Sequence, residues 1–109
     1  MTAYAVAVLT DVRVGDDVVE YLERIDATLE PFGGRFLIHG GTHHVVEGDD
    51  PGALVVIGFD DLDTARAWYD SDAYQQIVGL RTANADGSAF LVEGVGDGYR
   101  APDVLARPA

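Results

Sequence analysis

Residues 54–59 have the sequence Leu-Val-Val-Ile-Gly-Phe, a run without a polar side chain. A strand with one face in water alternates apolar and polar residues, so an unbroken apolar run predicts a strand covered on both faces. Residues 5–9 and 89–92 show the same pattern. The sequence therefore predicts a sheet that is apolar on its front and on its back.

Helical periodicity lies between these strands. From Asp16, apolar residues recur at the spacing of one helical face, and the Pro and Gly residues of 31–34 end this helix. A second helix is expected to begin at a cap formed by Asp61 or Asp63. Residues 71–72, Ser-Asp, are expected to break that helix and to cap a further helical piece.

The stretch 35–47 allows two interpretations. Residues 35–39 and 43–47 are both strand-like, and a Gly-Gly-Thr sequence separates them. They form either a tight hairpin closed by the glycines or one long strand bent at a glycine bulge, and we favour the bent strand. A clearer turn follows at 48–52, and a last strand is expected at about 88–95.

The resulting order, strand, helix, strand, strand, helix pair, strand, predicts a ferredoxin-like α+β sandwich with the βαββαβ order. We expect residues 1–95 to form this single domain. We expect 96–109, which contains Gly and Pro, to be a tail that is either loose or packed on a partner subunit.

Two helices cover one face of a four-stranded sheet and leave the other face bare. At roughly 25 cal/mol per Å² of apolar surface, several wet Val, Leu and Phe side chains would forfeit several kcal/mol. We therefore expect a homodimer in which two sheets face each other. The alternative is a marginal monomer whose second face buries only small residues.

Composition excludes several classes of function. The chain of 109 residues has 19 acidic residues and 7 arginines, and its net charge of -12 would repel nucleic acid and anionic membranes. Without cysteine or lysine, it has no thiol nucleophile, disulfide, thiolate metal site or Schiff base. We expect no cofactor. With no apolar run of ~20 residues, we also expect no membrane segment and a cytoplasmic location.

Short motifs spread along residues 4–95 resemble the domain-of-unknown-function family 1330. They are Tyr21, Phe32-Gly33-Gly34-Arg35, Gly40-Gly41, Glu47-Gly48, Phe59, Ala65, Trp68-Tyr69-Asp70-Ser71, Tyr74-Gln75, Arg81 and Glu93-Gly94. The resemblance implies a dimeric α+β barrel, a superfamily that includes cofactor-free monooxygenases, isomerases, polyketide cyclases and ligand-binding modules. The chain departs from the family at His39, where relatives usually have arginine before the glycine pair.

Candidate catalytic residues are His39 and Glu47. Histidine titrates near neutral pH, so His39 suits a general acid or base, and Glu47 would orient it. With His43 and His44 these residues also form a cluster of metal-capable groups, although strand alternation would separate His44 from the others. We assign no metal, because we favour the simpler explanation of one packed and two solvated histidines near a turn.

Candidate substrate-binding residues come from the helices. Arg81 lies in an apolar-aromatic stretch and would hold an anion, unless it pairs with an acidic residue of a neighbouring strand or subunit. Aromatic residues with polar tips would line a pocket between helices and sheet, although Trp68 also suits simple core packing. These are Tyr21, Trp68, Tyr69 and Tyr74.

We interpret the chain as a small-molecule-binding dimeric α+β barrel protein, and as a cofactor-independent enzyme of the isomerase or cyclase type. Proton transfer is the chemistry that these residues support most directly. The alternatives are a ligand-binding or sensing module without turnover and a structural subunit of a larger assembly.

Overall fold

The structure is a computed structural model and describes residues 1–106. In these residues four strands form one antiparallel sheet in the order β2-β3-β1-β4. The strands are β1 (Ala3–Thr10), β2 (Arg35–His39), β3 (Ala53–Phe59) and β4 (Asp86–Glu93). This order confirms the prediction of a ferredoxin-like sandwich and places the first strand at the centre of the sheet.

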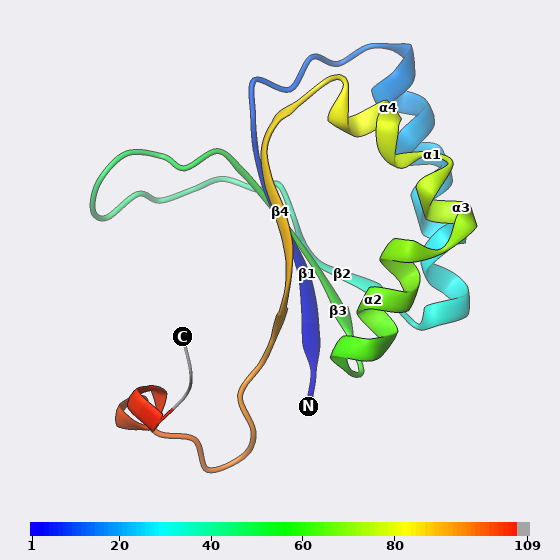
Figure 1. Cartoon of the computed structure of the whole chain (residues 1–109). Coiled ribbons are helices and arrows are strands. Elements are labelled where there is room, and N and C mark those ends of the chain that lie inside the picture. Colours follow the sequence, from blue (N-terminus) through cyan, green and yellow to red (C-terminus); the bar gives the residue numbers. More distant parts are fainter. Residues whose placement is uncertain (107–109) are drawn as a thin grey trace.

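The helices that follow β1 and β3 lie together on one side of the sheet (Figure 1). They are α1 (Asp16–Leu29), the 3₁₀ helix η1 (Glu30–Phe32), α2 (Leu62–Asp70), α3 (Asp72–Gln75) and α4 (Val78–Thr82). A further 3₁₀ helix, η2 (Ala101–Ala106), lies in the tail. No helix within residues 1–106 is both long and apolar enough to cross a membrane.

The ends of the helices follow the sequence signals. Asp61 caps α2 by accepting a 2.8 Å hydrogen bond from the backbone N–H of Thr64. Ser71 ends α2 by donating a hydrogen bond to the Trp68 carbonyl, and it caps α3 by accepting one from the N–H of Tyr74. The predicted break at residues 71–72 is confirmed.

The glycine pair after α1 turns the chain back toward the sheet. Gly33 has a φ of 65°, in the left-handed region that glycine adopts without strain. A Cβ on Gly34 would lie 2.7 Å from a methyl carbon of Leu29 and 2.8 Å from the Phe59 ring. Glycine therefore allows β2 to start directly against the core, where Phe59 packs on Trp68 with ring centroids 5.4 Å apart.

The strand expected at 43–47 is absent from the structure, so the bent-strand prediction is wrong. Strand β2 ends at His39, and Gly40 donates a last backbone hydrogen bond to Leu54. The loop 41–52 then leaves the sheet as a long arm (Figure 1). Residues 43–47 have a strand-like composition, but no other strand within residues 1–106 lies beside them to complete a ladder.

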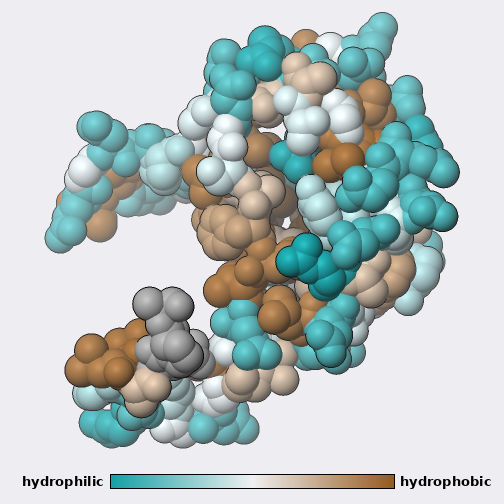
Figure 2. All heavy atoms as spheres, viewed as in Figure 1, coloured by the Kyte–Doolittle hydropathy of each residue, from teal (hydrophilic) through white to brown (hydrophobic). Residues whose placement is uncertain are grey.

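The side of the sheet away from the helices, called the open face below, is apolar and uncovered. Brown side chains lie on it in Figure 2. Leu37 and Phe90, on the two edge strands, are each 50% exposed although both side chains are large and apolar. The apolar members of the open face are Val6, Val8, Leu37, Ile38, Leu54, Val56, Phe90 and Val92. The sheet is therefore apolar on both faces, as predicted.

Candidate active site

A cavity of about 710 Å³ lies between the sheet and the helices. Figure 2 shows the molecule hollowed in this region. The strands leave this space because their helix-facing positions carry small side chains. These positions are Ala5 and Ala7 of β1, Ala53 of β3 and Ala89 of β4. Larger side chains at these positions would fill the cavity between the sheet and the helices.

Two tyrosines form a hydrogen-bonded pair in the cavity wall. The hydroxyl oxygens of Tyr21, on α1, and Tyr74, on α3, lie 2.7 Å apart in a buried setting. Burial, and then the neighbouring phenol of Tyr74, raise the pKa of Tyr21 far above its ordinary value. Tyr21 therefore keeps its proton at neutral pH.

Arg81 of α4 lies beside this pair. Its guanidinium is half-buried and interacts electrostatically with both phenols. Burial by itself lowers the pKa of Arg81, but the phenols of Tyr74 and Tyr21 outweigh it and raise that pKa. Among residues 1–106, no carboxylate lies within ion-pair distance of Arg81. The cavity therefore contains a permanent positive charge without a countercharge from the described part of this chain.

Trp68 forms an aromatic wall of the cavity together with Tyr69 and Tyr74. Its ring centroid lies 4.2 Å from that of Tyr74, and its indole N–H donates a 3.0 Å hydrogen bond to the hydroxyl of Thr28. Tyr69 packs against Tyr74 at 5.5 Å. The three rings therefore form one continuous aromatic wall.

His39 lines the cavity from the end of β2. The register pairs His39 with Val55, which turns its side chain to the helix side, and its ring stacks on Phe36 at 4.5 Å. The residue is exposed, so solvent reaches the imidazole. This placement suits a group that exchanges protons between the cavity and water.

Glu47 lies apart from His39 in this chain. It is an exposed residue of the arm and does not line the cavity. On the arm, the imidazole of His43 contacts the carboxylate of Asp50 at 2.9 Å. The N–H of Gly52, and next His43, hold the pKa of Asp50 below its usual range. In residues 1–106, no three His, Asp or Glu side chains converge as a metal site would require.

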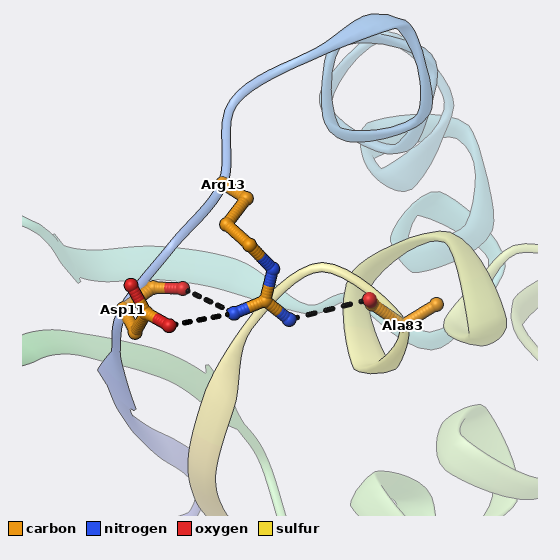
Figure 3. Close-up of polar contacts among 3 residues, drawn as sticks. All are labelled: Asp11, Arg13 and Ala83. Atoms are coloured by element: carbon orange, nitrogen blue, oxygen red, sulfur yellow. Dashed lines mark hydrogen bonds and ion pairs between the residues drawn. The ribbon is translucent and has the colours of Figure 1, made fainter.

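The loop between β1 and α1 closes one side of the cavity with Val12 and Val14. Arg13 anchors this loop across the sheet end (Figure 3). Its guanidinium donates 2.9 Å hydrogen bonds to the carbonyl and carboxylate of Asp11 and a 3.3 Å bond to the Ala83 carbonyl after α4. The sequence signals this loop only weakly, through the alternation of Val12 and Val14 around Arg13.

The profile of a family described as a domain of unknown function, DUF1330, matches residues 2–95. The chain belongs to this family. The resemblance found in the motifs is thereby confirmed. No curated protein matches this DUF1330 chain in sequence.

Solved structures show the same fold. A protein of unknown function from Rhodopseudomonas palustris is 11% identical, with a TM-score of 0.66 over 87% of this DUF1330 chain and 83% of the other. A dimeric ferredoxin-like protein of unknown function from Jannaschia sp. is 14% identical, with a TM-score of 0.65 and coverages of 86% and 100%. SnoaB, a cofactor-independent oxygenase from Streptomyces nogalater, is 13% identical, with a TM-score of 0.52 and coverages of 91% and 96%.

The cavity of this DUF1330 protein brings together most of the residues singled out from the sequence. Six of them line it: Tyr21, His39, Trp68, Tyr69, Tyr74 and Arg81. Glu47 does not. The structure adds Arg66 of α2, an exposed charged residue that the sequence does not distinguish from other surface arginines.

Proposed function

We propose that this protein binds a small organic molecule in the cavity between sheet and helices and catalyses a proton transfer on it without a cofactor. The observation that carries the proposal is the half-buried Arg81 beside two hydrogen-bonded phenols in a largely apolar space. A volume of about 710 Å³ lies within the range of small-molecule sites.

The roles follow from position. His39 removes a proton from a carbon next to a carbonyl group of the substrate. Negative charge then develops on the carbonyl oxygen, where Arg81 and Tyr74 stabilise it. Return of the proton to another carbon completes an isomerisation, so atoms and charge balance.

The structural similarity to SnoaB is consistent with a reaction that needs no cofactor. That protein is a cofactor-independent oxygenase. At 13% identity, this similarity supports only the view that a chain of this fold can act as an enzyme without a cofactor.

The second candidate is a ligand-binding module without turnover. The separation of Glu47 from His39 favours it, because the imidazole then lacks the carboxylate that was expected to orient it. In this function the aromatic wall and Arg81 hold a ligand that leaves unchanged.

We also propose that two copies pair through their open faces. Neighbours from Jannaschia sp. and Thermobifida fusca are dimeric ferredoxin-like proteins. The arm 41–52 and the tail 96–106 both extend on the open-face side (Figure 1). Val46 on the arm is 93% exposed and Leu105 on the tail is 87% exposed. A facing copy would bury these side chains together with the open face.

In this dimer, residues 1–95 would form the folded domain, and residues 96–106 of the tail would pack on the partner subunit. Residues 107–109 of the expected tail lie outside the described residues. A cytoplasmic location, which we expect from the sequence, belongs to the same proposal.

The test of function uses a small-molecule extract and mass spectrometry. Purified protein is incubated with the extract in D₂O, and bound and free compounds are compared with those of Ala7→Phe, which fills the cavity, and of Ala67→Phe on the outer side of α2 as control. We expect a compound that the wild type enriches, that gains deuterium, and that His39→Ala binds without exchange. A compound enriched but unchanged would support the binding module. Equal enrichment by Ala7→Phe would contradict the cavity as the site.

A further inference from the structure

The charged groups of the cavity differ from those of the rest of the molecule. The chain has 19 acidic residues against 7 arginines. Yet the described residues that line the cavity include two arginines, Arg66 and Arg81, together with His39, and no aspartate or glutamate. The distribution of charge in the cavity is therefore the reverse of that in the whole chain.

The positive side chains of the cavity would interact favourably with a negatively charged group of a ligand. The net charge of -12 repels free anions at long range. At short range the situation differs, because the half-buried guanidinium of Arg81 has no carboxylate partner in residues 1–106. Binding of a negatively charged ligand group would supply that partner inside the cavity. The arginine sites therefore act locally against the field of the whole chain.

The two arginines come from different helices. Arg81 lies on α4 beside the phenols, whereas Arg66 lies on α2 and is exposed. A guanidinium presents a planar pair of donors that matches a carboxylate, and the Tyr74 hydroxyl adjoins the same place. Most other side chains that line the space are apolar or aromatic.

We infer that the natural ligand is an apolar organic molecule that already carries a carboxylate when it enters, with its carboxylate at Arg81 and its body against the aromatic wall. Arg66 attracts the same anion from the solvent side. This inference rests on the proposed function and deepens it. In the proposed reaction Arg81 then has two roles: it binds the carboxylate of the ligand throughout, and with Tyr74 it stabilises the charge that develops on a neighbouring carbonyl oxygen. A neutral ketone would use Arg81 for the second role alone, so its binding would not depend on Arg81.

Three probes with one ring system test the inference by calorimetry: 2-naphthoate, 2-naphthalenemethanol and protonated 2-naphthylmethylamine. We expect 2-naphthoate to bind roughly 10- to 100-fold more tightly than the alcohol, the range for a charge-assisted contact. We expect the ammonium probe to bind most weakly, although the net charge of the protein favours it at long range.

Matched variants separate local from long-range charge, because each removes one arginine. Arg81→Gln should bring 2-naphthoate down to the affinity of the alcohol and leave the alcohol within about 3-fold. Arg66→Gln should weaken 2-naphthoate by a smaller factor. Arg24→Gln is the control, since Arg24 pairs with Glu20 at 2.8 Å on the exposed side of α1 and does not line the cavity. It should change nothing.

Each outcome supports or overturns the inference. Equal binding of 2-naphthoate and the alcohol, both lost in Ala7→Phe, would overturn the carboxylate ligand and leave the cavity as a binding site. Equal weakening by Arg24→Gln and Arg81→Gln would also overturn it, because only long-range charge would then act. If no probe binds the wild type, both the inference and the proposed small-molecule site fail. Should Arg81→Gln misfold, the order of the three probes on the wild type still decides.

Discussion

The hydroxyl oxygens of Tyr21 and Tyr74 lie 2.7 Å apart, although 53 residues separate them in the chain. This bond ties α1 to the short helix α3 and faces both phenols toward Arg81. The pair therefore serves the stability of the helix layer and the polarity of the cavity at the same time. Substitution of either tyrosine therefore tests the contribution of the bond to stability.

Tyr21→Phe and Tyr74→Phe each remove one phenol and leave the other without its buried partner. We expect each single change to lower the free energy of unfolding by about 1–3 kcal/mol. The double change should cost less than the sum, because it leaves neither hydroxyl unpaired. Urea unfolding of the four proteins gives this cycle. Strictly additive losses would mean that the bond does not couple the two helices.

The raised pKa of Tyr21 makes stability depend on alkaline pH. Above the ordinary pKa of 10.0, the unfolded chain loses the Tyr21 proton and the folded chain keeps it. The folded state then binds more protons, so stability falls as pH rises through this region, by up to about 1.4 kcal/mol per pH unit. Unfolding measured from pH 8 to 11 should show a shallower fall for Tyr21→Phe. An unchanged slope would contradict the burial of this phenol.

Arg13 holds Val12 and Val14 at the side of the cavity through its bonds to Asp11 and Ala83 (Figure 3). Because the bonds are exposed, Arg13→Ala should change stability by less than about 1 kcal/mol. Amide hydrogen exchange in residues 11–15 should nevertheless become faster. Arg24→Ala, which removes an exposed ion pair on α1, should leave that exchange unchanged. Equal exchange in wild type and Arg13→Ala would show that the loop is held otherwise.

Val56 lies at the centre of the open face, opposite Val6 on β1. An aspartate there would place an unpaired charge in the proposed interface between two copies. Sedimentation at low micromolar concentration should show a dimer for the wild type and a monomer for Val56→Asp. Ala67→Asp, on the exposed side of α2, should remain a dimer. A wild-type protein that sediments as a monomer would remove the pairing from the account.

The sequence predicted local and periodic features well. The α1 bounds follow from its apolar periodicity and the Pro and Gly residues after it. The Asp61 cap and the break at Ser71 follow from side-chain bonds within a few residues, so the local sequence reveals them. The prediction of a strand at 43–47 was wrong because a strand needs a partner strand for its backbone hydrogen bonds, and residues 1–106 supply none there.

The site could be predicted only in part. Aromatic residues and Arg81 on apolar helix faces have to point toward the sheet, so their meeting follows from periodicity. Whether Glu47 meets His39 depends on the path of the arm after Gly40, which no local pattern determines. Arg66 carries no signal either, because it is an exposed charged residue like other surface arginines and only the fold places it at the cavity.

A crystal structure of the protein grown with 2-naphthoate tests the central claim most directly. The account predicts electron density for one naphthoate per chain between sheet and helices, with its carboxylate on Arg81 and its rings against Trp68 and Tyr69. Density for the ligand elsewhere on the chain, with this cavity holding only solvent, would contradict it.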